Sequence, residues 1–426
     1  MNLKLIFCLI YLFLSMGLFN SGCSQNNKDR MPAVAGQFYS SDATQLSKEI
    51  ASFFKNAIAP KSPANNVVAI ISPHAGYIYS GQVAASSFNQ LEQNKEYKTI
   101  FIIGTSHRTT FDGAAIYNSG DFITPLGKIK VDKELASKLL KENKCFVVKD
   151  DAHIYEHCLE VQMPFLQYYL KKPFKIVPII IATYSINTIR QIANALEPFF
   201  NKDNLFVIST DFSHYPSYND AYVVDKKTAQ AIISNNSETL LNEIEEDIKD
   251  IPNLSTKLCG WSSVLTLLYI TENNADYQYI PIQYMNSGDV SGDKSRVVGY
   301  WAISVVQNNN KTDFINNNKE FELKTQDKKI LLNIARETLE SYIQKKIIPK
   351  IDTTSFSSIM YKKCGAFVTL HINGKLRGCI GRFFSDIPLY KLIQEMTIAS
   401  ATQDSRFMPV SKDEINKIDI EISILT

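Results

Sequence analysis

Three apolar stretches of this chain end on a histidine. They are Val67–His74 (VVAIISPH), Thr99–His107 (TIFIIGTSH) and Leu205–His214 (LFVISTDFSH). Short apolar runs rich in β-branched residues and bounded by polar or turn residues predict strands that are buried on both faces, as in a parallel sheet. Ligands of open α/β sheets bind beyond the carboxyl ends of the strands. The pattern therefore predicts one crevice lined by the three histidines, and Asp211 of the third stretch joins them there.

From residue 32 to residue 306, further apolar runs alternate with segments of helical spacing. The predicted helices are Leu46–Ala57, Gln82–Leu91, Ile186–Phe200 and Gly260–Ile270, and the additional strands are Phe174–Ala182, Tyr277–Met285 and Val297–Val306. Strands that alternate with helices indicate an α/β fold with a layered, mostly parallel sheet and flanking helices. This is the fold that we expect for the larger domain, residues 32–306.

Residues 307–329 are rich in asparagine and lysine and have almost no apolar pattern, so they predict a linker. A smaller α+β domain is expected over residues 330–426. Its predicted helices are Ile330–Ile343 and Ile387–Ala401, and its predicted strands are Gly365–Asn373, Leu376–Gly381 and Ile418–Leu425.

The first 22 residues carry Lys4 and then an apolar stretch from Leu5 to Phe19, which suits a signal sequence better than a spanning helix of roughly 20 residues. Small residues just before Cys23 resemble a bacterial lipoprotein box, although Asn20 departs from its leucine-like residue. The resemblance implies cleavage before Cys23, lipidation of its thiol, a short tether over residues 23–31, and a membrane-anchored, extracytoplasmic protein (periplasmic or on the cell surface). An uncleaved anchor and a plain secretory peptide are the alternatives.

Composition narrows the classes of function. With 45 basic and 43 acidic residues the formal net charge is +2, so no strong field points to nucleic acid. Beyond Cys8 and Cys23, five widely spaced cysteines remain. An odd, scattered set is a poor disulfide framework, so at least one cysteine is expected to do something other than pair.

The strand-end histidines suggest a metal site. Imidazole is the commonest protein ligand of first-row metals, and two buried imidazoles, His74 and His107, need partners. A structural histidine is the alternative at either position. Asp211 and His214 could orient a ligand or act as general acid and base, and a capping aspartate beside a loop histidine is the alternative.

Two further segments add candidates. Cys259 precedes an apolar helix, where a helix start favours the thiolate that binds metal, although a small core residue is the alternative. The segment EHCLE opens an amphipathic helix, so His157 and Glu160 should share a face. Glu160 could instead only pair with the helix dipole. We expect His153 to face solvent.

Together these motifs (PHAGYIYSG, GTSH, EHCLE, TDFSH and LCGW) resemble the Memo family, known as protein B of the AmmeMemoRadiSam system, over roughly residues 30–306. The resemblance implies the fold of class III extradiol (LigB-type) dioxygenases. It also implies iron or copper, rather than zinc, held by His74, His107 and Cys259, with Asp211 and His214 close by. The LigB-type enzymes use a glutamate where this chain has the cysteine, and this departure argues against classical ring cleavage.

The motifs LRGCIG (Leu376–Gly381) and DSRFMPV (Asp404–Val410) resemble the AMME-type (AMMECR) domain, which we expect to be truncated here after its last strand. The resemblance implies a link to a radical SAM protein. Such a partner would be cytoplasmic, and this location conflicts with the export that the N-terminal segment predicts. Cys379 is either catalytic or merely packed. Arg377 either binds an anion or forms a surface salt bridge.

The leading hypothesis is a metal-dependent redox protein, an oxidoreductase or dioxygenase-like enzyme of unknown substrate, in which Asp211, His214 and His157 are catalytic. Tyr77, Glu160 and Trp261 are the candidate substrate-binding residues. The alternative is a non-catalytic module that binds a peptide or a metal, with Tyr77, Tyr79 and Trp261 as aromatic walls. A serine hydrolase is disfavoured because the Gly-x-Ser-x-Gly elbow is absent from the sequence.

Overall fold

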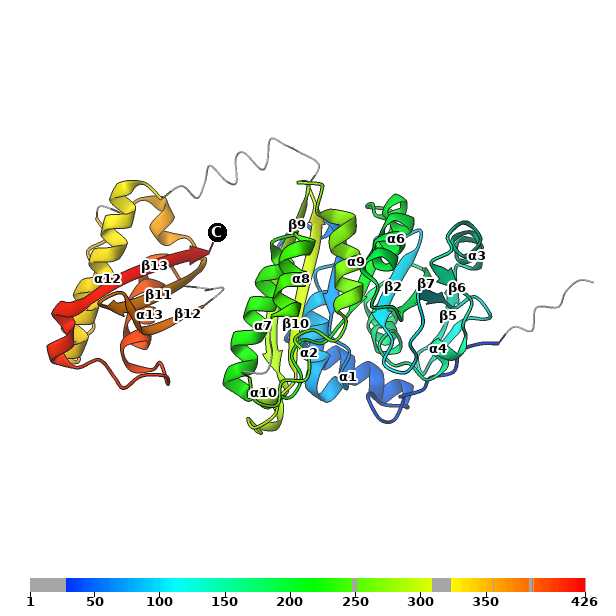
Figure 1. Cartoon of the computed structure of the whole chain (residues 1–426), viewed down its shortest axis with the longest axis horizontal. Coiled ribbons are helices and arrows are strands. Elements are labelled where there is room, and N and C mark those ends of the chain that lie inside the picture. The colour runs from blue at the N-terminus through cyan, green and yellow to red at the C-terminus, as the bar shows by residue number, and fades with distance from the viewer. Residues whose placement is uncertain are drawn as a thin grey trace, which may run out of the picture. The chain divides into compact units, whose positions relative to one another are not determined.

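A computed structural model describes residues 28–246, 251–308, 323–354, 356–382, 385 and 387–425. The chain forms two compact units that divide at Asn309 and Asn310 (Figure 1). The predicted signal sequence, the lipidation site Cys23 and most of the predicted linker lie outside the described residues. No described helix is both long and apolar enough to cross a membrane.

The N-terminal unit is built on one ten-stranded mixed sheet. Its core is four parallel strands in the order β7, β2, β8, β1, continued by antiparallel β10 and β9. On the other side β5 pairs parallel with β7 and antiparallel with β4, while β3 pairs with β7 and β6. The strands are β1 Val67–Ser72, β2 Ile100–Thr105, β3 Ala114–Ile116, β4 Phe122–Thr124, β5 Gly127–Val131, β6 Phe146–Val147, β7 Lys175–Ile181, β8 Leu205–Ser209, β9 Tyr277–Asn286 and β10 Gly299–Gln307. The mostly parallel, layered α/β fold is therefore confirmed.

Helices cover both faces of this sheet, and each face has its own apolar core. One core contains side chains of α1 (Ala43–Lys55), α2 (Tyr77–Phe88) and α5 (Met163–Tyr169). The other contains side chains of α3 (Lys133–Glu142), α6 (Ile186–Leu196), α7 (Tyr218–Ile233), α8 (Ser237–Glu245) and α9 (Trp261–Thr271). Short elements complete the unit: α4 Asp151–Ile154, α10 Ser287–Ser291, and the 3₁₀ turns Ala64–Asn66, Glu160–Gln162 and Glu197–Phe199. The central strands read as uninterrupted apolar runs because both of their faces are covered.

Strand register sets where the candidate side chains emerge. Ser209, the last residue of β8, lies beside Ser72 of β1 on one side and Gly104 of β2 on the other. The three strands therefore end in one row, and the loops that follow them open at one edge of the sheet. Helix α9 starts close to this row, since a Cβ on Gly260 would lie 2.6 Å from Cβ of Thr210. That close approach, which only glycine allows, brings the preceding Cys259 to the edge.

The C-terminal unit has a three-stranded antiparallel sheet in the order β12, β11, β13. Two helices pack on it, and their apolar side chains share one core with β11. The elements are α12 Thr325–Lys345, β11 Gly365–Ile372, β12 Lys375–Arg382, α13 Leu389–Thr402 and β13 Ile418–Leu425, with 3₁₀ turns at Ser358–Tyr361 and Lys412–Lys417. The predicted α+β class is correct.

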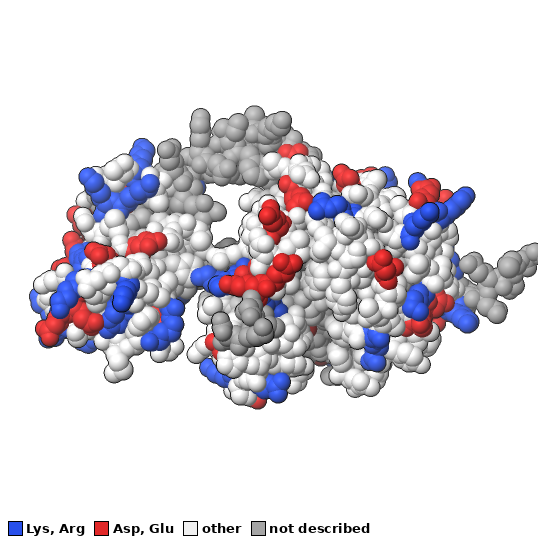
Figure 2. Space-filling model, in the orientation of Figure 1, with Lys and Arg blue, Asp and Glu red and all other residues white. Residues whose placement is uncertain are grey.

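The charged side chains of the described residues are mixed in sign. On the face seen in Figure 2, basic and acidic groups intermingle.

Three helices begin earlier than predicted, and α1 does so by three residues, at Ala43 rather than Leu46. The other two differ by a longer stretch. Helix α2 starts at Tyr77 rather than Gln82, because the Tyr77 N–H donates to the carbonyl of Phe38 at 2.7 Å and fixes the first turn. Helix α12 starts at Thr325 rather than Ile330, where Asp327 accepts from the Lys324 N–H at 3.2 Å. Both first turns lack an apolar period, so no periodic signal marked them in the sequence.

We expect Gly104→Ala to destabilise the N-terminal unit by about 1–3 kcal/mol, the range for overpacking a core. A Cβ at Gly104 would lie 2.5 Å from Sγ of Cys158. Urea denaturation of the full chain measures the loss. Gly76→Ala is the control, since the nearest atom would be 3.6 Å away. In a Cys158→Ala background the loss should shrink, and an unchanged loss would show that the clash is not with the sulfur.

Candidate metal centre

Three histidine rings and one cysteine meet beyond the strand ends. The ring centroids are 5.1 Å apart for His74 and His107, 5.3 Å for His74 and His157, and 4.7 Å for His107 and His157. One ring nitrogen of each lies within 4.8 Å of the others. Sγ of Cys259 lies 3.1 Å from Nε2 of His74. We call these four side chains the donor cluster. It unites the three predicted metal ligands with His157, which the sequence suggested only as a catalytic residue.

Asp211 ties two members of the donor cluster together. Its Oδ1 accepts from the backbone N–H of His74 at 2.7 Å, and its own backbone N–H donates to Sγ of Cys259 at 3.2 Å. Its carbonyl accepts from the Cys259 N–H at 3.2 Å. Asp211 is almost fully buried, and burial raises the pKa of its carboxyl. The predicted aspartate therefore lies against the cluster and holds its backbone in place.

The buried Glu156 orients two of the imidazoles. Its Oε1 lies 2.9 Å from Nδ1 of His107 and 3.2 Å from Nδ1 of His157, and its Oε2 accepts from the His107 backbone N–H at 2.7 Å. Burial works against ionisation, but these hydrogen bonds hold the pKa of Glu156 well below its usual range. An ionised carboxylate can only accept, so each ring carries a proton on Nδ1 and a ligand would bind at Nε2. Burial acts against the charged form of His107, but hydrogen bonds with Cys158, Cys259 and Glu156 raise its pKa, so a metal ion would displace the proton on its Nε2.

Glu156, His107 and Cys158 are also close enough together to suggest a second metal position. Both carboxylate oxygens of Glu156, however, already accept hydrogen bonds from His107. Cys158 is buried, and its Sγ lies 3.6 Å from the carbonyl of Thr105. Glu156 therefore orients a ligand rather than being one. Sequence analysis assigned no role to Glu156, although it opens the EHCLE motif.

The thiol of Cys259 corrects one expectation. A helix start was expected to favour its thiolate, but burial raises the pKa of Cys259, so burial outweighs the helix end. Burial likewise lowers the pKa of His74 well below its usual value. In the absence of metal the pair is therefore a neutral thiol beside a neutral imidazole. A metal ion would displace the thiol proton on binding.

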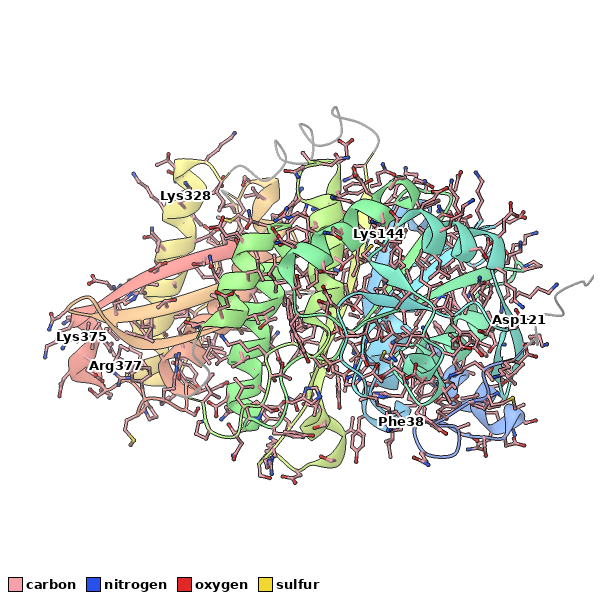
Figure 3. The ribbon with its side chains drawn as sticks, turned by 45° about the vertical axis from the view of Figure 1, so that its right-hand side comes forward. Phe38, Asp121, Lys144, Lys328, Lys375 and Arg377 are labelled. Carbon is pink, nitrogen blue, oxygen red and sulfur yellow. The ribbon has the colours of Figure 1, made fainter. Side chains whose placement is uncertain are left out.

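The N-terminal segment contributes to the centre in a way that the sequence did not reveal. The ring of Phe38, labelled in Figure 3, lies 5.0 Å from that of His157. The segment is held by the buried Arg30, which forms an ion pair with Glu160 and donates to the carbonyls of His153 at 3.1 Å and Glu156 at 2.6 Å. This segment has no apolar period, so nothing in the pattern placed it at the site.

Two predicted substrate-binding residues are enclosed by protein. Tyr77 is 1% exposed, and its hydroxyl donates to the carbonyl of Val161 at 2.7 Å. Glu160 is also 1% exposed, and besides Arg30 it accepts from the hydroxyl of Tyr39 and from two backbone N–H groups. Tyr77 therefore forms no open aromatic wall, and the contacts of Glu160 assign it a structural role.

Trp261, His214 and His153 are not members of the donor cluster. Trp261 is half-buried at the start of α9. Its ring stacks with that of Tyr184, and the two ring centroids are 6.2 Å apart. His214 is outside the four donors, and its Nδ1 lies 3.0 Å from the carbonyl of Phe212. His153 is 2% exposed rather than solvent-facing, because its Nε2 bonds to the Ala115 carbonyl at 3.2 Å and its ring packs against Tyr117.

The candidates of the C-terminal unit have contacts of their own. Arg377, labelled on β12 in Figure 3, donates to Glu414 at 2.7 and 3.0 Å, and this pairing lowers the pKa of Glu414 to about 2. This is the salt bridge foreseen as the alternative to anion binding. Cys379 accepts from the hydroxyl of Thr369 at 3.2 Å, and its backbone N–H donates to Asp404 at 2.8 Å.

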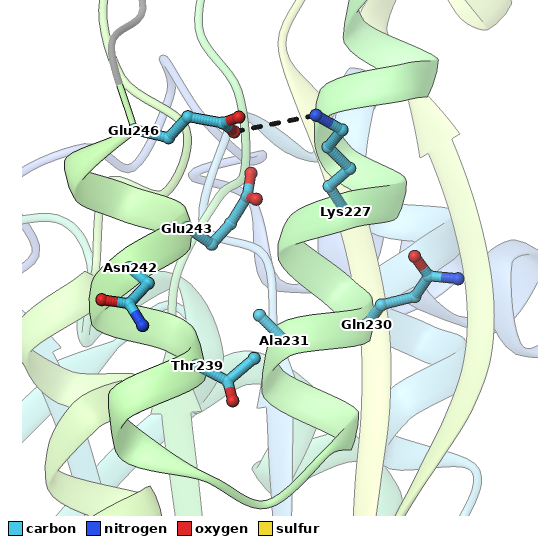
Figure 4. A pocket seen from close by; sticks show the side chains of 7 residues that line it. All are labelled: Lys227, Gln230, Ala231, Thr239, Asn242, Glu243 and Glu246. Carbon is cyan, nitrogen blue, oxygen red and sulfur yellow. Dashed lines mark ion pairs between the residues drawn. The ribbon is translucent and has the colours of Figure 1, made fainter.

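A surface hollow of about 500 Å³ lies between α7 and α8 (Figure 4). Most of the residues that line it are of polar or charged type: Lys227, Gln230, Ala231, Thr239, Asn242, Glu243 and Glu246. Lys227 and Glu246 form an ion pair across it at 3.7 Å. No residue predicted from the sequence lines this hollow, so the candidate chemistry stays at the strand ends.

Asp225 of α7 is a buried acid that sequence analysis missed. It accepts from the backbone N–H of Ser213 at 2.8 Å and from the hydroxyl of Tyr284 at 2.7 Å. Burial raises the pKa of Asp225 to about 7, although these hydrogen bonds act in the opposite direction. Through Ser213 it fixes the loop that carries Asp211 and His214.

Comparisons with protein families agree with this division into units. The profile described as Memo-like protein matches residues 30–304, and that described as AMMECR1 matches residues 332–426. A MEMO1 family protein of Sulfurisphaera tokodaii is 33% identical over 287 residues, which cover 64% of this chain and 98% of that protein. The MEMO1 family protein MK0963 of Methanopyrus kandleri is 34% identical over 286 residues, which cover 65% of this chain and 98% of that protein.

Two solved structures of uncharacterized proteins are similar to parts of this chain. PH0010 of Pyrococcus horikoshii is 32% identical and covers 22% of this chain and 49% of its own, with a TM-score of 0.21. JW3007 of Escherichia coli K12 is 12% identical, and the match covers 56% of this chain and 99% of JW3007, with a TM-score of 0.38. The assignment of the fold therefore rests on the strand order described above.

Glu160→Gln is expected to destabilise the N-terminal unit by about 3–5 kcal/mol, because it leaves the buried Arg30 without its counter-charge. Asp203→Asn is the matched control. Asp203 pairs with Lys98 on the surface, where the two side chains are 59% and 75% exposed, and the loss should be much smaller than for Glu160→Gln because solvent screens the pair. Urea unfolding measures both, and equal losses would contradict the structural role of Glu160.

Asp225→Asn tests the buried acid through pH. A carboxyl whose pKa is raised by folding binds its proton more tightly in the folded state. The contribution of Asp225 to the free energy of unfolding therefore falls as pH rises from about 4 to about 7. The wild type should lose on the order of 4 kcal/mol relative to Asp225→Asn across this window. Asp203→Asn is the control, because the hydrogen bond from Lys98 lowers the pKa of Asp203 and its contribution therefore changes only below about pH 4. Its curve should run parallel to that of the wild type across the window from about pH 4 to about 7. Parallel pH curves for wild type and Asp225→Asn would refute the assignment.

Proposed function

This chain belongs to the Memo-like protein family through residues 30–304, and on that premise we propose that it is a redox protein that binds iron or copper at His74, His107 and Cys259. One observation carries the proposal. The Sγ of Cys259 and one ring nitrogen from each of three histidines converge within a few ångströms, as described above. His157 supplies a further donor at the same position.

The chemistry of the donors fits a transition metal. Imidazole nitrogen and thiolate sulfur suit iron, copper and zinc, whereas magnesium and calcium prefer carboxylate, carbonyl and water oxygens. Both imidazoles beside Glu156 are held with Nδ1 protonated, so a ligand needs no rearrangement of these rings. We propose iron or copper ahead of zinc because the resemblance to the Memo family implies them.

Bound iron or copper would supply one-electron chemistry. The surrounding residues have separate roles in the proposal. The backbone N–H of Asp211 donates to the sulfur of Cys259 and stabilises negative charge there. Asp211 and His214 move or hold protons at the rim of the cluster. Phe38 covers the ring of His157 and keeps bulk water from that side.

We expect the purified full chain to bind about one equivalent of Fe²⁺ or Cu⁺ per molecule, by elemental analysis and anaerobic titration. His74→Ala and Cys259→Ser should weaken binding more than roughly 100-fold, beyond the loss typical of residues that only orient a ligand. His371→Ala is the control, because His371 lies on β11 of the other unit.

Oxygen consumption by the metal-loaded chain in the presence of a reductant then separates redox function from metal binding. Consumption that disappears in Cys259→Ser supports the oxidoreductase. Tight binding without any redox turnover would favour the alternative, a non-catalytic metal-binding module. A wild-type chain that binds neither metal would refute the proposed function.

A further inference from the structure

Ser209 occupies a fully buried position behind His74, at the end of β8. Its hydroxyl oxygen has three close neighbours. They are Nδ1 of His74 at 3.0 Å, the carbonyl oxygen of Cys158 at 2.6 Å and Nε2 of Gln162 at 2.9 Å. Neither Ser209 nor Gln162 has a role in the proposed function so far.

The proton positions in this group follow from counting donors. A hydroxyl has one hydrogen to donate and two lone pairs that accept. A carbonyl oxygen only accepts, so the hydroxyl hydrogen of Ser209 must point at the carbonyl of Cys158. Without a hydrogen between them, the two oxygens, 2.6 Å apart, would repel each other. The Ser209 oxygen is then left with its two lone pairs for the other two neighbours.

The side-chain amide of Gln162 is oriented by the same reasoning. Its Nε2 lies 2.9 Å from the carbonyl of Pro73, so the nitrogen rather than the oxygen of the amide must face that side. Gln162 therefore donates to Ser209 and fills one lone pair. The other lone pair accepts from His74, which requires the imidazole hydrogen on Nδ1.

We infer that Ser209, fixed by the Cys158 carbonyl and the Gln162 amide, is a positioning residue that locks His74 in its Nδ1–H form and so directs the bare Nε2 at the metal. That Nε2 faces Cys259 at 3.1 Å. This inference rests on the proposed metal-binding function. It gives the third imidazole the same proton arrangement that Glu156 imposes on His107 and His157, but by a neutral group.

A purely structural role for Ser209 and Gln162 would make different predictions. They would then only satisfy the buried carbonyls of Cys158 and Pro73, and their loss would lower stability without touching metal affinity. The state of the His74 ring and the spectrum of a bound metal distinguish the two roles.

The first measurement uses the metal-free full chain, labelled with ¹⁵N-histidine. Long-range ¹H–¹⁵N correlation reads which ring nitrogen carries the hydrogen, and His74→Gln identifies the signal. We expect His74 in the Nδ1–H form in the wild type. A signal with the hydrogen on Nε2 would overturn the inference even if no variant folds.

The second measurement titrates Co²⁺ alone into wild type, Ser209→Ala and Gln162→Leu and records its visible spectrum. We expect Ser209→Ala to bind roughly 10- to 100-fold more weakly, the range for residues that orient a metal ligand, with shifted ligand-field bands. Gln162→Leu should bind more weakly than wild type and more tightly than Ser209→Ala, since the hydroxyl remains.

Matched controls exist within the same unit. Ser87 is fully buried and donates to the Ala84 carbonyl, and Gln90 is fully buried and donates to the carbonyls of Ile58 and Ser86. Ser87→Ala and Gln90→Leu should leave Co²⁺ affinity and spectrum unchanged. Wild-type affinity and spectrum in Ser209→Ala would overturn this inference alone, whereas a wild type that binds no Co²⁺ would contradict the proposed function instead.

Discussion

The candidate centre depends on the hydrogen bonds of one buried carboxylate, that of Glu156. It holds the Nδ1 atoms of His107 and His157 and the backbone of His107 with two oxygens. An ionised group enclosed by protein is stable only when hydrogen bonds replace its lost hydration. The imidazoles supply these bonds, so the acid and its two histidines stabilise one another in a single arrangement.

The rest of the N-terminal unit brings the other donors to this acid. Level strand ends place the loop of His74 beside that of β8, and Asp211 from the latter binds both His74 and Cys259. The absence of a side chain at Gly260 lets the start of α9 approach β8. Each donor is thus positioned by backbone geometry as well as by its own rotamer.

Sequence reasoning succeeded where the chain is periodic. The runs before His74 and His107 predicted parallel strands, and their ends do lie in one row because Ser72 and Gly104 are both in register with Ser209 of β8. It failed for Phe38, Glu156 and Asp225, for different reasons. Phe38 lies in an irregular segment without a period, Glu156 acts by orienting other residues, and Asp225 acts through a tertiary contact with the backbone of Ser213 that no periodic pattern reports. It also misjudged His153 and the Cys259 thiol, because burial, which local sequence does not report, decides both.

The anchoring of the N-terminal segment has a mechanical consequence. Arg30 is bonded to Glu160 and to the carbonyls of His153 and Glu156, while Phe38, eight residues later, lies on His157. A pull applied to the chain at Lys28 would be resisted at the guanidinium before any load reached the aromatic ring. Phe38 is thereby shielded from a pull on that end of the unit, whereas part of the load would pass through the guanidinium to the backbone of Glu156.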